Sequence, residues 1–287
     1  MSTWFFVSDL HGRRARFERL FEQIAAQRPV AVLIGGDILP GGATLRDDPQ
    51  VGDFVRDYLA PRILDLRTAL GQAAPRVLLI LGNDDPRCEE AAFVEAAALG
   101  AWEYIHERRA RVDDCDVYGY GCVPPTPFRL KDWERYDVSR YLDPGDVSPE
   151  DGVRTMPVDP GTIRHGTIRD DLERLTGNAD LSTAVLLFHA PPYRSALDRV
   201  HRRLASYEHA PLDEHVGSVA IRELIEARGP RVTLHGHIHE SPRLAGAWRE
   251  RIGGTWCFSA AHDGPELALV RFDPCDPAAA TRELIRA

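Results

Sequence analysis

The chain has 287 residues, with 35 Lys and Arg against 44 Asp and Glu, and 44% of its residues are hydrophobic. This composition is typical of a soluble globular protein. No apolar run approaches the roughly 20 residues that a membrane-spanning helix needs, and the first residues lack the basic start of a secretory signal. We therefore predict a cytoplasmic protein that does not bind membranes.

The net charge of −9 argues against a protein that coats nucleic acid, because such binding needs clustered positive charge. We therefore do not expect a long nucleic acid as a partner. The five cysteines are scattered and show no CxxC spacing, which predicts reduced thiols and neither a disulfide framework nor a zinc knuckle. Nothing in the sequence indicates an oligomeric state.

The first third of the chain alternates short apolar runs with amphipathic stretches. Apolar runs at 4–7, 30–34 and 76–81 predict buried strands, because each is short and ends at turn-forming residues. Apolar residues at helical spacing predict a helix over 13–27, and a long helix is expected over 52–71. Apolar strands that alternate with helices indicate a mainly parallel sheet covered on both faces.

The stretch from about 123 to 168 breaks this rhythm. It begins with the segment Pro124-Pro125-Thr126-Pro127 and is rich in Pro, Gly and Asp, with several aromatic residues but no clean periodicity. A structureless insert of this length is unusual, so we expect a lid, a binding loop or an arm that docks a protein partner. We predict one domain over 1–287 that carries this insert, because no linker or repeat divides the chain.

Beyond the insert the strand and helix pattern returns. Apolar runs at 181–188 and 231–234 predict strands, with a helix between them over 218–228. The runs 255–259 and 267–272 are expected to be antiparallel strands. The whole pattern indicates an α/β fold.

Polar residues that can bind a metal follow five of the predicted strands. They are Asp9 and His11, Asp37, Asn83, His189, and His237 with His239. Ligands of such sheets bind outside the carboxyl ends of the strands, so we expect these side chains to lie close together. Imidazole, carboxylate and amide groups suit Mn, Fe, Zn and similar divalent ions. Neighbouring glycines let the backbone turn sharply and let an anion approach.

The same segments, in the same order along the chain, resemble the motifs of the calcineurin-like metallophosphoesterases. They are Asp9-Leu10-His11-Gly12, Gly36-Asp37, Gly82-Asn83-Asp84-Asp85, His189 and Gly236-His237-Ile238-His239. The segments Thr126-Pro127-Phe128 and His189-Ala190-Pro191-Pro192-Tyr193 further resemble a subgroup of predicted phosphoesterases related to the Icc cyclic-nucleotide phosphodiesterases. The resemblance implies a four-layer α/β/β/α sandwich of two mixed sheets.

It also implies two divalent metal ions (Mn, Fe or Zn) as cofactors. In this family pattern Asp37 would bridge the two ions. The first ion would be held by Asp9, His11 and His239, and the second by Asn83, His189 and His237. A hydroxide bridging the ions would attack phosphorus in line. Small phosphodiesters, cyclic nucleotides among them, are the first substrate class that we expect; phosphomonoesters come second and nucleic acids third.

Asp84 departs from the family pattern, which has His at this position. A His there donates a proton near neutral pH, whereas an ordinary Asp is already ionised. Two interpretations stay open: Asp84 caps a helix that begins near Pro86, or it acts as a catalytic acid whose pKa is raised by burial or by a like charge. An ionised Asp84 would repel a dianionic monoester and so favour a diester.

The rival interpretation is a non-catalytic scaffold. A retromer subunit has this fold and serves as an interaction module, so the fold alone does not guarantee activity. In this sequence each of the seven ligand positions of the family pattern carries a residue that can bind a metal, which favours an enzyme. Tyr193 is expected either to stack on a base or to pack a turn, and His235, which the family pattern does not use, is expected to be structural.

Overall fold

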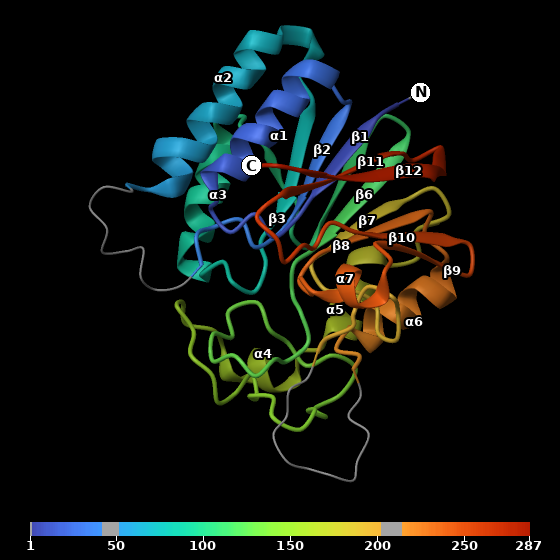
Figure 1. The fold of residues 1–287 in the computed structure, drawn as a ribbon. Helices are drawn as coiled ribbons and strands as arrows, with labels where there is room; N and C mark the ends of the chain where they lie inside the picture. The colour runs from blue at the N-terminus through green and yellow to red at the C-terminus, as the bar shows by residue number, and fades with distance from the viewer. Residues whose placement is uncertain (1, 42–51, 202–213) are drawn as a thin grey trace.

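Two six-stranded sheets lie face to face in the computed structural model, which describes residues 2–41, 52–201 and 214–287 (Figure 1). In the first sheet the strand order is β12-β11-β1-β2-β3-β4. Strands β1 to β4 are parallel, and β11 and β12 are antiparallel to their neighbours. The bounds are β1 (Trp4–Val7), β2 (Ala31–Gly35), β3 (Arg76–Ile80), β4 (Glu103–Tyr104), β11 (Leu267–Asp273) and β12 (Asp276–Ile285).

The second sheet has the order β5-β6-β7-β8-β10-β9. Its four central strands run parallel, and the two edge strands β5 and β9 are antiparallel to their neighbours. The bounds are β5 (Arg108–Val112), β6 (Cys115–Tyr120), β7 (Val185–Phe188), β8 (Val232–His235), β9 (Arg249–Ile252) and β10 (Thr255–Ser259). Both sheets are therefore mixed.

Helices cover the outer face of each sheet (Figure 1). The first sheet is covered by α1 (Arg14–Gln27), α2 (Ala60–Leu70) and α3 (Glu90–Ala98), and the second by α5 (Ile168–Thr176) and α6 (Val219–Arg228). The shorter helices are η2 (Phe54–Leu59), η3 (Gly71–Ala73), η4 (Arg87–Glu89), α4 (Pro160–His165) and α7 (Ser241–Ala245). The predicted four-layer α/β/β/α sandwich is thereby confirmed. No helix of the described segments is long and apolar enough to cross a membrane.

Strand β1 shows why the predicted strands are apolar throughout. Trp4 and Phe6 pack into the layer between the two sheets, whereas Phe5 and Val7 pack toward the helices. Side chains alternate between the two faces of a strand, and here both faces are buried. An uninterrupted apolar run is therefore what this position requires.

The expectation for the C-terminal strands was partly wrong. Strands β10 and β11 lie in different sheets: β10 pairs in parallel with β8, whereas β11 pairs in antiparallel with β1. Composition alone cannot separate these arrangements, since both strands are buried and apolar. The run 181–188 also forms a strand only from Val185 onward.

The insert over 123–168 is held by isolated bridges and side-chain bonds. Val123 bridges Glu134, and Tyr136 bridges Thr167. The only lysine of the chain, Lys131, is fully buried and forms an ion pair with Glu134. Figure 1 shows the insert, with α4, below the two sheets. It is irregular yet anchored, so a freely solvated segment is excluded.

Candidate metal centre

The predicted metal-binding residues lie in loops at the carboxyl ends of strands from both sheets. Loops after β1, β2 and β3 supply the residues of the first sheet, and loops after β7 and β8 supply those of the second. The backbone joins these loops, because Asp9 N–H donates to the carbonyl oxygen of Gly36 (3.0 Å) and Gly236 N–H donates to that of His189 (2.9 Å). The structure brings together all seven side chains: Asp9, His11, Asp37, Asn83, His189, His237 and His239.

A first cluster consists of Asp9, His11, Asp37 and His239, whose ligand atoms lie within 4.8 Å of one another. His239 Nε2 lies 3.2 Å from Asp9 Oδ1 and 3.1 Å from His11 Nε2. His11 Nε2 in turn lies 3.9 Å from Asp37 Oδ2. Two imidazole nitrogens and two carboxylates thus converge on one point.

A second cluster contains Asp37, His189 and His237. His189 Nε2 lies 3.3 Å from Asp37 Oδ2 and 3.1 Å from Asn83 Oδ1, so the amide oxygen belongs to the same group. Asp37 is the residue common to both clusters. This is the shared position that the family resemblance implies for it.

The chemistry of these residues fits two divalent cations. Asp9 and Asp37 are almost fully buried, and Asp9 Oδ2 has no hydrogen-bond partner among the described residues. A buried carboxylate oxygen without a partner is costly, and a bound cation would supply the missing partner. Oxygen and imidazole nitrogen are ligands that Mn, Fe and Zn accept.

The surroundings of His189 determine which of its nitrogens faces the site. Its Nδ1 lies 2.7 Å from the carbonyl oxygen of Gly35, so Nδ1–H donates and Nε2 points at Asp37 and Asn83. Burial alone would lower the pKa of His189, but the negative charges of Asp37 and Asp9 outweigh it and raise this pKa to about 10. The same negative potential attracts a metal cation.

Unusual backbone geometry accompanies the site. Asp9, His11, Asp37 and His237 all have positive φ angles, of 57°, 47°, 51° and 71°. Residues other than glycine rarely adopt this region, and such strain gathers at functional sites. Gly82 is required for a different reason: a Cβ atom there would lie 2.3 Å from Asp37 Oδ1.

Asp84 lies at the edge of the metal centre. Its N–H donates to Asp37 Oδ1 (2.9 Å), its Oδ1 accepts from Asn83 Nδ2 (3.1 Å), and its Oδ2 lies 3.8 Å from His11 Nδ1. Partial burial and the charge of Asp37 raise the pKa of Asp84. The helix-cap interpretation is wrong, because η4 begins after Pro86 and receives no side-chain cap.

Asp85 holds the metal-site loops together. Its carboxylate accepts hydrogen bonds from the backbone N–H groups of Gly82 (2.9 Å), Ile38 (2.9 Å) and Leu39 (2.8 Å), and its carbonyl oxygen accepts from Trp133 Nε1 (2.6 Å). It thereby ties the loops after β2 and β3 to each other and to the insert. The sequence indicated Asp85 only as a match to the acidic position of the family motif, and it did not reveal this structural role.

A cavity of about 760 Å³ opens over the metal centre. Asp37, Asn83, His237 and His239 line its base, and the insert supplies much of its wall. Among the described residues that line this cavity there is no Lys or Arg. The apolar and aromatic lining consists mainly of Pro124, Pro125, Pro127, Phe128, Val138, Tyr141, Leu142 and Tyr193.

His235 and Tyr193, the two other residues singled out in the sequence, lie in different surroundings. His235 is fully buried, with Nδ1 2.8 Å from the carbonyl oxygen of Ala190 and Nε2 2.7 Å from Thr233 Oγ1. Its role is therefore structural, as expected. Tyr193 lines the cavity and its ring contacts that of His215, with centroids 6.3 Å apart.

The fold and the cluster of metal-competent side chains define a metal-dependent class of phosphoester hydrolase. The model of the calcineurin-like phosphoesterase family matches residues 4–241. The chain therefore belongs to the calcineurin-like phosphoesterase family. No curated protein matches the sequence.

Solved structures share this fold at low sequence identity. One is 17% identical over 99% of both chains and has a TM-score of 0.61. A protein of Thermus thermophilus is 14% identical over 99% of both chains, with a TM-score of 0.55. A dimetal phosphatase from Danio rerio is 14% identical over 94% of this chain and 91% of its own, with a TM-score of 0.50.

Proposed function

We propose that this protein is a dinuclear metal-dependent hydrolase of small phosphodiesters, with cyclic nucleotides among the candidate substrates. The observation that carries the proposal is the pair of clusters that share Asp37. Two divalent ions, when bound, would bind phosphoryl oxygens and lower the pKa of a water. The protein's own contribution is to hold the ligands in place: Gly35 orients the imidazole of His189, and Asp85 fixes the loop that carries Asn83.

Charge at the cavity favours a diester over a monoester. No Lys or Arg lines the cavity among the described residues, and the carboxylate of Asp84 faces it. A phosphodiester carries one negative charge, whereas a monoester carries close to two at neutral pH. The diester is therefore repelled less by Asp84. The likeness to a dimetal phosphatase in fold keeps a phosphomonoesterase as the second candidate.

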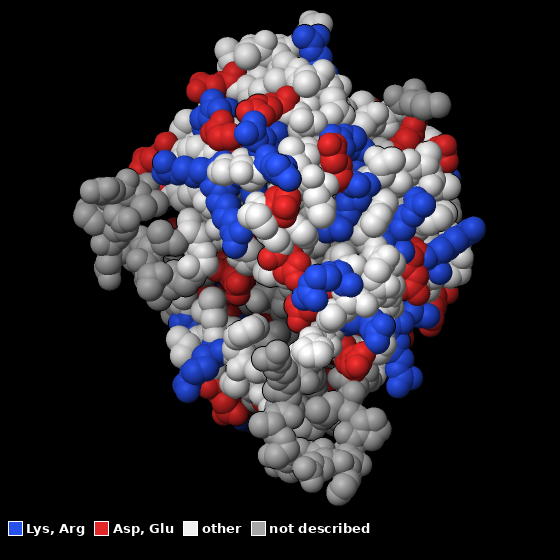
Figure 2. Space-filling model, viewed as in Figure 1, with Lys and Arg blue, Asp and Glu red and all other residues white. Residues whose placement is uncertain are grey.

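The insert favours a small substrate with an apolar group. Pro125, Phe128 and Tyr141 line the cavity and offer flat apolar surfaces, which supports a binding loop over an arm that docks a protein partner. On the face of the molecule drawn in Figure 2, Lys and Arg are interspersed with Asp and Glu. A long nucleic acid would need a continuous basic surface.

The test compares three substrates with added Mn²⁺: bis(4-nitrophenyl) phosphate, 4-nitrophenyl phosphate and single-stranded DNA. We expect the diester to have the highest kcat/KM. Faster hydrolysis of the monoester would identify a phosphatase, and faster hydrolysis of DNA a nuclease. Fewer than about one metal equivalent per chain, together with no Mn²⁺-stimulated hydrolysis, would favour the scaffold.

A further inference from the structure

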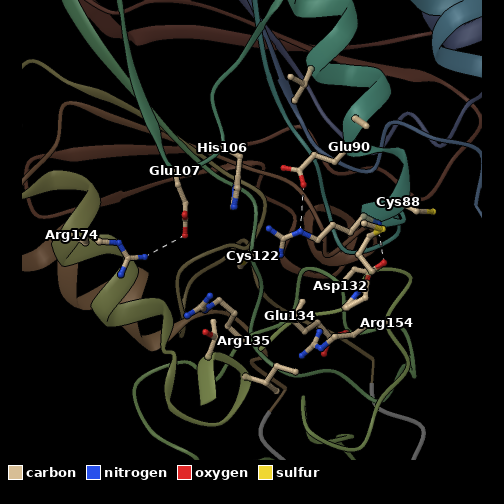
Figure 3. A pocket seen from close by; sticks show the side chains of 18 of the residues that line it. Cys88, Glu90, His106, Glu107, Cys122, Asp132, Glu134, Arg135, Arg154 and Arg174 are labelled. Carbon is tan, nitrogen blue, oxygen red and sulfur yellow. Dashed lines mark hydrogen bonds and ion pairs between the residues drawn. The ribbon is translucent and has the colours of Figure 1, made fainter. Parts of the chain in front are cut away.

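A second cavity, of about 880 Å³, lies between α3, the turn from β4 to β5, and the insert (Figure 3). It shares no lining residue with the cavity over the metal centre, and it contains none of the predicted metal ligands. Its volume lies within the range of small-molecule sites, which is about 300–1,000 Å³. The proposed phosphodiesterase activity does not use it.

His106 offers a hydrogen-bond donor to this cavity. Its Nδ1 accepts from the backbone N–H of Gly121 (3.0 Å), so the proton of the neutral ring is on Nε2. Figure 3 shows the ring directed into the cavity. Burial and the charges of Arg87, Arg135 and Arg108 lower the pKa of His106 to about 3. The ring is therefore a neutral donor in positively charged surroundings.

Guanidinium groups from separate segments line the same cavity. Arg154 bonds to the carbonyl oxygens of Lys131 and Pro149 and forms no ion pair among the described residues. Arg87 Nε lies 3.4 Å from Glu90 Oε2, and the Arg87 guanidinium lies over the ring of Trp133, 5.0 Å from its centroid. Arg135 likewise contacts Asp171 through Nε, at 2.8 Å. N–H groups of these side chains are thus left for a ligand.

Five carboxylates line the cavity against four guanidinium groups, and all five are already engaged. Glu95 pairs with Arg56 (2.7 Å) and Glu107 with Arg174 (3.5 Å). Glu90 accepts from the hydroxyl of Tyr104 (2.8 Å). Asp132 accepts from the backbone N–H groups of Arg87 and Thr155 (both 2.9 Å) and from the Thr155 hydroxyl. Glu134 is paired with Lys131. The cavity therefore presents unused donors more than unused acceptors, which selects for an anionic ligand.

We propose that this cavity binds a small organic phosphate, with the phosphate at His106, Arg87, Arg135 and Arg154. These donors belong to different segments and approach from different sides (Figure 3), which suits a tetrahedral group better than a planar carboxylate. The apolar part of the ligand would lie against Val94 of α3 and Met156 of the insert, which both line the cavity and are about half exposed, at 47% and 46%.

The probe is phenylphosphonate, which has a phosphate-like dianion, an apolar ring and a C–P bond that a phosphoesterase does not hydrolyse. Calorimetric titration of the full chain with EDTA present should show one site, since the metal centre is then not loaded. Arg154→Met and Arg87→Met should each weaken binding by about tenfold or more, because each removes charge-assisted hydrogen bonds. Arg140→Met, an exposed insert arginine that does not line the cavity, is the matched control.

The proposal is overturned if the wild-type chain does not bind millimolar phenylphosphonate in EDTA, or if neither cavity variant weakens binding. Equal binding of benzoate would overturn the choice of phosphate. Thermal midpoints without ligand verify folding. If Arg154→Met does not fold, Arg87→Met decides, because 37% of the Arg87 side chain is exposed and Met can keep an apolar contact with the Trp133 ring, over which the guanidinium lies at 5.0 Å.

Discussion

Asp84 and Asp85 are neighbours in sequence but have opposite surroundings. The carboxylate of Asp85 is fully buried and accepts backbone hydrogen bonds from two loops. The side chain of Asp84 is 46% exposed and faces the metal-site cavity. One residue therefore maintains the structure of the site, and the other is available to a substrate.

This difference predicts opposite effects of the same substitution. Asp85→Asn should lower the free energy of unfolding by about 2–4 kcal/mol, because it weakens charge-assisted bonds and turns an amide toward N–H donors. Asp84→Asn should change it by less than about 0.5 kcal/mol, as surface substitutions usually do. Urea denaturation in EDTA measures both values without a contribution from bound metal. Equal losses in the two variants would contradict the assignment.

Asp84 should also influence the choice between diester and monoester. Asp84→His should lower hydrolysis of bis(4-nitrophenyl) phosphate relative to 4-nitrophenyl phosphate by about tenfold. This corresponds to about 1.4 kcal/mol, which is less than the roughly 4 kcal/mol between two unit charges 4 Å apart at an effective dielectric constant of about 20. Asp84→Asn separates charge from proton donation, since it removes the charge without adding an acid. An unchanged ratio of diester to monoester hydrolysis in Asp84→His would contradict this role of Asp84.

The parts of the molecule differ in how far sequence could predict them. The strands that lead to the metal centre were predictable because both of their faces are buried, as β1 and β2 show. The edge strands could not be predicted in this way, because β5 contains exposed arginines and most of β12 is not buried. Their stability comes from pairing with a neighbouring strand, which leaves no apolar pattern to detect.

The metal-site residues were recognisable because each follows a strand and belongs to a short motif. Trp133 had no such signal. It lies in the irregular insert, yet its Nε1 donates to the carbonyl oxygen of Asp85 and its ring contacts His106. Contacts of this kind depend on how the insert folds against the sheets. No local spacing in the sequence encodes them.

Metal binding should depend on the residue shared by both clusters. The wild-type chain should hold two Mn²⁺ ions and Asn83→Ala about one, whereas Asp37→Asn should weaken both sites because its carboxylate belongs to both clusters. Bound metal should stabilise the fold by about 2.7 kcal/mol at 100 times its dissociation constant. Elemental analysis after dialysis gives the stoichiometry, and thermal midpoints with and without EDTA give the stabilisation. Two ions retained by Asp37→Asn would contradict the shared role.

The lowered pKa of His106 predicts that the free energy of unfolding decreases in acid. Its pKa is lowered to about 3 by burial and by Arg87, Arg135 and Arg108, whereas an unfolded His titrates near 6.5. Between these values the unfolded state binds more protons, so stability falls as the pH drops below about 6.5. At pH 5 this amounts to about 1–2 kcal/mol. His106→Gln, which keeps an acceptor for Gly121 N–H, should show a smaller loss between pH 7.5 and 5 in urea denaturation; an identical loss would contradict the prediction.

The buried ion pair of the insert provides the last prediction. Lys131 and Glu134 are 0% and 2% exposed, and Glu134 also accepts from the N–H (2.7 Å) and hydroxyl (2.6 Å) of Thr126, which lines the metal-site cavity. Lys131→Met should cost about 3–5 kcal/mol in urea denaturation, because it leaves a buried carboxylate without its cation.

The double variant Lys131→Met/Glu134→Gln should recover most of this loss, since a neutral amide oxygen can still accept from Thr126 N–H without a buried charge. The single variant should also raise KM for the diester, because the wall that contains Thr126 loses its anchor. A double variant as unstable as the single one would show that Lys131 stabilises the insert by packing and not by neutralising Glu134.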